Sequence, residues 1–250
     1  MAHGEFGWCE LLHYNQETVQ NFYGHIMGWQ FWDADDVPST RVRIQASVTK
    51  MPATFVDLQM PSFWMSHIEV DDVEATCAVA AAHGGKVEMV ERGEGSESGF
   101  ALICDPSGAG FTVFAGVEGV ALSRRTFHRC GHILYTDDPS LVAEFYQNVF
   151  GWDLSPSPEG YHVQAGTQRI EISNAVPELR GGHSFWSVMF ALPTMDYLPD
   201  GILGTGGRII RKAKTRYGHS AWIMDPEGAV VGFVEKPMLG GWQDWASAMF

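Results

Sequence analysis

Basic side chains are scarce in this sequence, and their scarcity limits the partners that it can have. The 250 residues include 16 lysines and arginines against 30 aspartates and glutamates, which gives a formal net charge of −14 and an isoelectric point near 5.0. Nucleic acids and anionic membranes both require a concentrated positive surface. The sequence therefore predicts no nucleic acid and no membrane as a partner, and it favours a small molecule.

Cysteine is also rare, and its spacing indicates neither a disulfide framework nor a metal site. The four cysteines form no CxxC pair and no Cys/His spacing typical of zinc, and three of them lie in apolar runs, as buried thiols do in a reducing compartment. No apolar run approaches the roughly 20 residues of a membrane helix. The first residues show no signal-peptide pattern. We therefore expect a cytoplasmic protein.

Several common catalytic fingerprints are missing as well. The sequence has no P-loop, no dinucleotide-binding motif and no Ser-His-Asp arrangement. Gly84-Gly85 and Gly206-Gly207 follow predicted helices, so we expect them to end helices and not to hold phosphate. Apolar residues are plentiful: hydrophobic residues make up 45% and charged residues 18% of the chain. This composition predicts a sizeable core in one large or two ordinary domains.

The chain contains a long internal repeat. Residues 21–29 (NFYGHIMGW) return as residues 144–152 (EFYQNVFGW) at an offset of 123. Three shorter motifs recur in the same order, at offsets of 122, 122 and 120: Ser-Phe-Trp at 62–64 and 184–186, Gly-Gly at 84–85 and 206–207, and Asp-Pro at 105–106 and 225–226. Four motifs in one order predict a tandem duplication.

Each half of the chain divides into two units that begin with a strand followed by a helix. In unit 1 we expect a strand at 7–14, a helix capped by Asn15 and ended by Gly28, and strands at 41–48 and 54–60. Unit 2 is expected to contain a strand at 63–70, a helix at 73–83 and strands at 100–104 and 110–114. Units 3 and 4 span about 128–175 and 184–236. These units predict two domains, 1–116 and 128–236, with a linker at 117–127 and a tail at 237–250.

This order of motifs resembles the vicinal oxygen chelate superfamily, which includes glyoxalase I, extradiol dioxygenases and bleomycin-resistance proteins. The resemblance rests on the helix that ends in FYxxxxGW and on the later GGxV and DPxG motifs, and it covers about residues 7–236. It looks closest to tandem four-unit members. It implies an α+β fold in which four βαβββ units form two open, cavity-enclosing mixed β-barrels with helices outside. Whether unit 1 pairs with unit 2 or with unit 4 is left open.

The metal ligands that the resemblance implies are absent from the matching positions. Metal-dependent members carry ligands at the start of the first strand and on a late strand of each unit. Those positions here are occupied by Trp8, Gly131, Met65, Ser187, Thr112 and Gly232. None of these is a usual metal ligand. Asp57 and Glu171 alone keep a carboxylate at matched positions. We therefore expect no cofactor, and a divalent metal held by His67, Glu10 and Asp57 remains an alternative.

Strand alternation gathers acid/base groups on one face of the first half. Glu10 shares a strand face with Trp8 and Leu12, and His67 shares one with Met65 and Glu69. Carboxylates and a histidine aimed into an apolar cavity are costly unless they are paired or used. We predict that the catalytic residues are His67, Glu10 and Asp57, and that Trp8, Met65, Glu69 and Phe114 hold a flat aromatic ligand. A purely structural role for His67 is the competing interpretation.

The matching face of the second half is more apolar. The sequence predicts Tyr135, Glu171 and Met189 as ligand-binding residues there, with His162 and His219 as further polar groups. We expect Trp29 and Trp152, which follow the helix-ending glycines, to belong to the core.

Three classes of function follow from these patterns. The first is a metal-independent lyase- or isomerase-type enzyme that dehydrates, cyclises or isomerises a hydrophobic aromatic molecule, as polyketide tailoring requires. The second is a resistance protein that sequesters a drug or metabolite without turnover. The third is a metal-dependent glyoxalase or dioxygenase with shifted ligands. An inward-facing titrating group favours the first over the second, because sequestration needs none. The sequence is compatible with a monomer or a homodimer.

Overall fold

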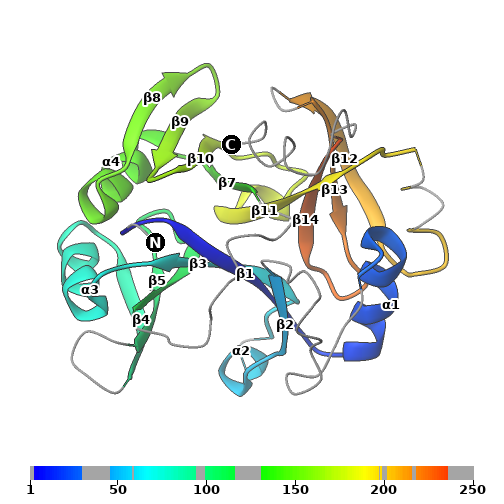
Figure 1. Cartoon of the computed structure of the whole chain (residues 1–250), viewed down its shortest axis with the longest axis horizontal. Helices are drawn as coiled ribbons and strands as arrows, with labels where there is room; N and C mark the ends of the chain where they lie inside the picture. The colour runs from blue at the N-terminus through cyan, green and yellow to red at the C-terminus, as the bar shows by residue number, and fades with distance from the viewer. Residues whose placement is uncertain are drawn as a thin grey trace.

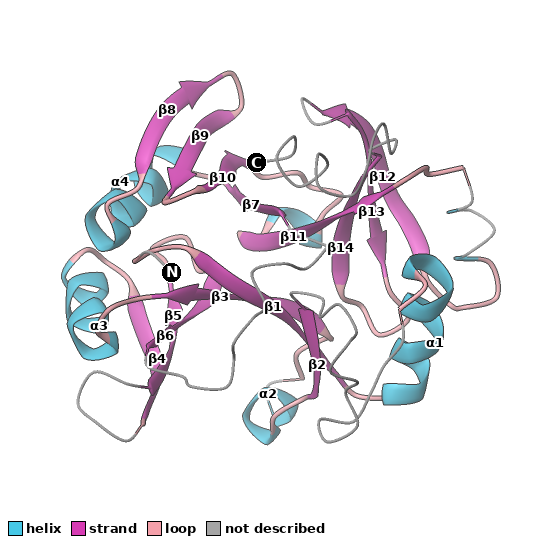
Figure 2. Ribbon diagram, in the orientation of Figure 1, coloured by secondary structure: helices cyan, strands magenta, loops and turns pink. Residues whose placement is uncertain are grey.

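Two mixed β-sheets form the framework of the protein (Figures 1 and 2). The computed structural model describes residues 3–29, 46–57, 59–93, 99–115, 131–196, 198, 202–215 and 218–235. The first sheet has the strand order β2-β1-β3-β6-β5-β4 and is built from β1 (Phe6–His13), β2 (Ala46–Lys50), β3 (Phe63–Glu69), β4 (Lys86–Arg92), β5 (Gly99–Cys104) and β6 (Gly110–Ala115). The second has the order β12-β13-β14-β11-β7-β10-β9-β8 and is built from β7 (Gly131–Thr136), β8 (Asp153–Ser157), β9 (Gly160–Ala165), β10 (Gln168–Asn174), β11 (Phe185–Leu192), β12 (Arg208–Thr215), β13 (Gly218–Met224) and β14 (Val230–Glu235).

The two long helices of the repeat begin and end by the same local chemistry. The side chain of Asn15 accepts a hydrogen bond from the backbone N–H of Thr18 at the start of α1 (Gln16–Met27), and Gly28 ends the helix at φ 66°. In α4 (Pro139–Phe150), Asp138 is the capping residue and Gly151 ends the helix at φ 67°. A positive φ favours glycine, which has no Cβ. The predicted helix at 73–83 is confirmed as α3 (Val73–Ala82).

One predicted strand of unit 1 is wrong. Residues 54–60 do not form a strand, because a short helix, α2 (Ala53–Asp57), occupies the start of this segment. Its first turn follows Pro52, whose carbonyl accepts hydrogen bonds from Phe55 and Val56, and proline suits the start of a helix because it lacks an N–H to satisfy. The strand expected at 41–48 is observed as β2, at 46–50. Residues 41–45, the linker at 117–127 and the tail at 237–250 lie outside the described residues.

The sheets pair unit 1 with unit 2 and unit 3 with unit 4. Strand β1 runs antiparallel to β3 with Trp8 opposite His67, and β7 runs antiparallel to β11 with Gly131 opposite Met189. These two pairs are related by the offsets of the sequence repeat, so matched positions occupy matched places in both sheets. Among the described residues, no strand pairing joins the edge strands of either sheet. The predicted α+β fold with mixed β-structure is therefore confirmed, whereas the two predicted open barrels are not confirmed, since within the described residues each sheet stays open.

The helices cross to the opposite half of the chain. Helix α1 belongs to unit 1, but its buried face packs with Phe190 and Phe233 of the second sheet as well as with Leu11 of β1. Helix α4 belongs to unit 3, and it packs with Phe111 and Val113 of the first sheet. Figure 1 shows the result: α1 lies beside β12–β14, and α4 lies beside α3. The strands therefore pair unit 1 with unit 2 and unit 3 with unit 4, whereas helices α1 and α4 also pack against the opposite half of the chain.

A buried hydrogen-bond network fixes the first of these crossings. The indole Nε1 of Trp64 donates to the hydroxyl of Tyr23 at 3.1 Å, and that hydroxyl donates to Oδ2 of Asp225 at 3.1 Å. Tyr23 lies on α1, whereas Asp225 belongs to the second half. Both side chains are buried. Burial raises the pKa of Tyr23 well above its usual value, so this hydroxyl stays protonated and remains a donor.

The second crossing repeats the first with the halves exchanged. Trp186 Nε1 donates to the Tyr146 hydroxyl at 2.9 Å, and this hydroxyl donates to Asp105 Oδ2 at 3.0 Å. Three of the repeated sequence motifs therefore meet in each network. The Ser-Phe-Trp and FYxxxxGW motifs come from one half, and the Asp-Pro motif comes from the other.

The repeated Gly-Gly motif completes the contact. A Cβ on Gly207 would overlap Phe22 of α1, and a Cβ on Gly85 would lie 2.7 Å from Cε2 of Phe145 of α4. Glycine is needed at both places because each aromatic ring of the crossing helix lies directly against the backbone of the opposite half. These residues of the repeated motifs thus join the two halves of the chain, whereas Phe63 and Phe185 of the Ser-Phe-Trp motifs belong to the apolar clusters around Met65 and Tyr135.

Candidate functional site

A histidine and a glutamate face each other on the first sheet. Nε2 of His67 on β3 lies 3.6 Å from Oε2 of Glu10 on β1. The His67 side chain is 6% exposed and that of Glu10 is 23% exposed, so the glutamate is on the open side of the pair. Trp8 stacks on the His67 ring with centroids 4.2 Å apart and planes at 11°. The face predicted by strand alternation therefore does bring Trp8, Glu10 and His67 together.

The other nitrogen of His67 is held by Thr112 on β6. Nδ1 forms a short hydrogen bond with Oγ1 of Thr112, and this oxygen also lies 3.5 Å from the carbonyl oxygen of Ser66. If the threonine hydroxyl donates to that carbonyl, the ring must donate from Nδ1 and keep its lone pair on Nε2. In either tautomer, the contact with Thr112 orients the ring so that Nε2 is directed at Glu10.

Apolar and aromatic side chains surround the pair. Phe114 lies 4.5 Å from the ring of Trp8, and Phe100 lies 6.2 Å from it. Met65 is buried in a cluster with residues that extend the same apolar surface along β1 and β3: Leu12, Met51 and Phe63. Two predicted wall residues, Trp8 and Phe114, therefore contact each other beside the His67–Glu10 pair, and Met65 extends the wall.

The two remaining carboxylates predicted for this site have different positions. Glu69 ends β3, two residues beyond His67, and it is half-buried opposite Phe114 of β6. Asp57 is exposed at the end of α2 and does not lie on a strand. In strand register, the counterpart of Glu171 is Ser47, because Ser47 pairs with Glu10 as Glu171 pairs with Ile133. The prediction that Asp57 matches Glu171 is therefore wrong, since α2 interrupts the expected strand.

The second sheet carries a cavity of about 540 Å³. Residues of both edge strands line it, Ser157 from β8 and Arg211 from β12, so the sheet curves around the space. Tyr135 and Glu171, two of the predicted ligand-binding residues, line this cavity, and so does His162. Met189 is buried beneath it, in a cluster with Tyr135 and Trp222.

Comparison with known proteins connects this architecture to a family. The model of the "Glyoxalase/Bleomycin resistance protein/Dioxygenase superfamily" matches residues 6–113, which reach from the start of β1 into β6 of the first sheet. The first half of the chain therefore matches this superfamily. The vicinal oxygen chelate resemblance is thereby confirmed.

Relatives and solved structures extend the likeness over both halves. The chain is 28% identical to "Putative glyoxylase CFP32" of Mycobacterium bovis, over 94% of this chain and 95% of the relative. It is 26% identical to "Anthracycline biosynthesis protein DauV" of Streptomyces sp. strain C5, over 94% of each chain. The structure of the 2,3-dioxygenase LapB from Pseudomonas sp. KL28 superposes with a TM-score of 0.58 at 16% identity, covering 94% of this chain and 93% of that one. At this identity the structural match shows a shared fold.

Metal-dependent members of the superfamily raise the question of whether this site fits a metal ion. A catalytic site needs about three protein ligands. Glu10 and His67 provide two donors, but their neighbours in strand register are Met65 and Thr112, which are not usual ligands. Within the described ranges, no group of three or more His, Cys, Asp and Glu side chains is placed to hold a metal ion. The donor set on these strands does not fit a resident metal.

Arg211 and Trp222 line the second cavity and were not predicted from the sequence. A compositional signal was available: β12 contains four of the 16 basic residues of the chain within eight positions. In a protein of net charge −14, such a concentration is unusual and could have indicated an anion-binding strand. Trp222 is the register partner of Arg211 on β13. His219, also on β13, is exposed and does not line the cavity.

Every helix in the described part of the chain is too short or too polar to span a lipid bilayer.

Proposed function

We propose that this protein is a metal-independent enzyme that performs acid/base chemistry on a hydrophobic aromatic small molecule. The observation that carries the proposal is the His67–Glu10 pair, with 3.6 Å between Nε2 and Oε2, on an apolar and aromatic surface. Dehydration, cyclisation and isomerisation each need one group that removes a proton and one that returns it. The pair supplies both groups without a cofactor.

The arrangement around His67 supports a role in proton transfer. Thr112 orients the ring through Nδ1 and leaves Nε2 directed at Glu10. At 3.6 Å the two atoms are just beyond hydrogen-bond distance, as catalytic pairs often are before a substrate is bound. In this scheme Nε2 takes a proton from a carbon or hydroxyl of the substrate, and the partly exposed Glu10 exchanges the proton with the product or with water. Trp8, stacked on the ring, restricts both the histidine and the substrate plane.

The substrate class is inferred from the walls and from one relative. Trp8, Phe100 and Phe114 provide aromatic faces against which a planar molecule can stack. The relative DauV is named as an anthracycline biosynthesis protein, which supports a role for this chain in tailoring an aromatic natural product.

Proton transfer can be tested without knowing the substrate in advance. The protein is incubated in D₂O with a panel of hydroxylated polycyclic aromatic polyketides, and mass spectrometry records deuterium incorporation or loss of water. For any compound that reacts, His67→Gln should lower turnover by about 100-fold or more, while binding, followed by tryptophan fluorescence, changes little. His219→Gln is the control, because this histidine is exposed on the second sheet. Unchanged turnover in His67→Gln would remove the pair from the mechanism.

The same assay separates the competing functions. A sequestering protein would bind members of the panel and release them unchanged, and His67→Gln would not affect its protective effect in cells. A metal-dependent enzyme would lose activity on dialysis against a chelator and regain it with a divalent ion. We expect activity to survive the chelator, since the part of the chain that the structure describes brings no three His, Cys, Asp or Glu side chains together in a way that could hold a metal ion.

A further inference from the structure

The cavity of the second sheet is large enough for a ligand of its own. Its volume of about 540 Å³ falls within the range of small-molecule sites in proteins, roughly 300–1,000 Å³. It lies on β7–β10, β12 and β13, whereas His67 and Glu10 belong to the first sheet. The floor contains Ile133 and Tyr135, and the Tyr135 ring lies 6.2 Å from that of Trp222 in an edge-on arrangement.

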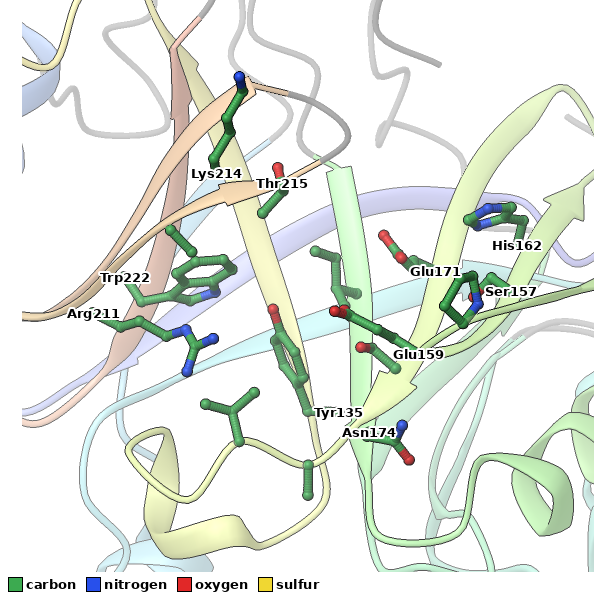
Figure 3. Close-up of a pocket in the computed structure, with 16 residues that line it drawn as sticks. Tyr135, Ser157, Glu159, His162, Glu171, Asn174, Arg211, Lys214, Thr215 and Trp222 are labelled. Carbon is green, nitrogen blue, oxygen red and sulfur yellow. The ribbon is translucent and has the colours of Figure 1, made fainter.

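One wall of this cavity presents hydrogen-bond donors. Figure 3 shows Arg211 and Trp222 on the same side, with the hydroxyl of Tyr135 between them and the opposite wall. Trp222 is 2% exposed, and its Nε1 has no hydrogen-bond acceptor among the described residues. A buried N–H without an acceptor is uncommon and costly. The Nε1 atom is itself shielded from solvent, so a ligand oxygen in the cavity can bind this donor only after neighbouring side chains move.

Arg211 adds further hydrogen-bond donors to the same wall. Within the described part of the chain its guanidinium makes one long contact, 3.5 Å from Nη1 to Oε2 of Glu178. A guanidinium has five N–H donors, so most of them remain able to bind a carboxylate or another anionic oxygen. The adjacent Lys214 adds positive charge at the rim of the cavity.

The opposite wall is acidic. Glu171 on β10 faces His162 on β9 in strand register, and Glu159 lies at the turn between β8 and β9. Figure 3 shows these side chains across the cavity from Arg211 and Trp222. A ligand with an anionic group alone would be repelled by the glutamates, and one with a cationic group alone would be repelled by Arg211 and Lys214. A ligand that carries both charges satisfies both walls.

We propose that this cavity is a second ligand site, specific for an aromatic zwitterion. The anionic oxygen of the ligand binds Arg211 and the Nε1–H of Trp222, its ammonium group binds Glu171, and its planar body lies over Ile133 and Tyr135. The site works independently of proton transfer at His67, so the two can be lost separately.

Three compounds with one two-ring body and different charges test the proposal by calorimetry. L-Thyronine is a zwitterion, thyronamine is a cation, and the deaminated acid of thyronine is an anion. We expect L-thyronine to bind at least about tenfold more tightly than either analogue, because each charge-assisted contact contributes roughly that factor. Equal affinities for the three compounds, a preference for a singly charged one, or no binding at millimolar concentration would overturn the proposal.

Single substitutions test which charged group of the ligand each wall binds. Arg211→Gln should weaken L-thyronine and the anion about tenfold without weakening thyronamine, while Glu171→Gln should weaken L-thyronine and thyronamine without weakening the anion. Trp222→Phe keeps an aromatic ring and removes the donor, so it should weaken the anion. Lys212→Gln is the matched control, since Lys212 is exposed on the same strand outside the cavity lining.

A last variant separates this site from the proposed active site. His67→Gln should leave all three affinities unchanged. If it abolished L-thyronine binding, the ligand would occupy the first sheet, and the second-site proposal would be refuted while the proposed function stood. Each variant is checked for an unchanged melting temperature before its affinity is compared.

Discussion

Removing the hydroxyl group of Tyr146 should weaken the contact between the two halves of this protein and lower its stability. Tyr146 on α4 accepts from Trp186 and donates to Asp105 across the contact between the halves. Tyr146→Phe deletes only the hydroxyl. It leaves the indole N–H of Trp186 without its acceptor and Oδ2 of Asp105 without its donor. Asp105 keeps the hydrogen bonds of Oδ1 to Ser107 and Ala109, so the motif itself should stay folded.

The expected cost follows from what is left unpaired. A buried neutral donor without a partner costs about 1–3 kcal/mol, and a lost hydrogen bond to a charged group about 1.5–3 kcal/mol. Allowing for relaxation, we expect a loss of about 2–5 kcal/mol from a total stability that is on the order of 5–15 kcal/mol. In a chain of this length the melting temperature should fall by about 2–4 °C for each kcal/mol.

Urea unfolding followed by tryptophan fluorescence and circular dichroism measures this loss. Tyr161→Phe is the control, because the Tyr161 hydroxyl makes one 3.3 Å contact with Ser140 at an exposed position and its removal should change stability by less than about 0.5 kcal/mol. The double variant with Asp105→Asn should cost less than the sum of the single variants, since both act on one network. A Tyr146→Phe protein as stable as the control, or fully additive single effects, would refute the network as a source of coupling.

Two further perturbations test the contact that helix α1 makes with the second half of the chain. Gly207→Ala places a Cβ in the position of the Phe22 ring and should destabilise the folded protein by about 1–3 kcal/mol. In the double variant, Phe22→Leu should restore part of this loss. A Gly207→Ala protein as stable as the wild type would contradict the close packing of Phe22 on Gly207. Burial raises the pKa of Asp225 to about 6, above the value of about 3.9 in an unfolded chain, so the folded state binds the extra proton between these values. The free energy of unfolding of the wild type relative to Asp225→Asn should therefore fall by on the order of 2–3 kcal/mol as pH rises from about 4 to 6 and stay constant at higher pH. Parallel urea titrations of the two proteins measure this difference. A difference that does not depend on pH would contradict the raised pKa.

Strand alternation predicted the first candidate site because the relevant part of β1 is regular. The register between β1 and β3 shifts between Phe6 and Trp8, but it is continuous from Trp8 onward. The two-residue period therefore placed Trp8 and Glu10 on one face, opposite His67. An irregularity two residues later would have inverted the assignment.

Asp57 was misplaced for a related reason. An offset of 124, close to that of the repeat, relates Ser47 of β2 to Glu171 of β10, whereas Asp57 precedes Glu171 by 114 residues. The helix α2 follows β2, which is the counterpart of β10 in unit 1. The pattern of apolar residues over 54–60 is too short to distinguish a strand from a helix, whereas Pro52 before it was a local signal for the helix.

The crossing of the helices could not be predicted from the sequence. Tyr23 and Asp225 are 202 residues apart, and the repeat makes the contact with Asp105 of the same half equally plausible by pattern. The choice depends on the direction in which the chain leaves β1, which is a property of the folded sheets. Arg211 and Trp222 were missed for a similar reason, because they reach the cavity only through the curvature of the second sheet.

Each sheet has a packed side that contacts the opposite half and a concave side that carries a candidate site, and this difference explains how the halves came to differ. The tyrosine, tryptophan and aspartate residues of the repeated motifs lie on the packed side, where Phe22, Tyr23 and their counterparts contact the opposite half, and a change there costs stability in both halves. The concave sides carry no such constraint, and matched positions hold different residues: His67 and Glu10 in the first sheet correspond to Met189 and Ile133 in the second. Glu171, a carboxylate of the second face, occupies the place of Ser47 in the first. Each face could therefore change its chemistry separately, and a proton-transfer site and a charged binding site can coexist on one interlocked scaffold.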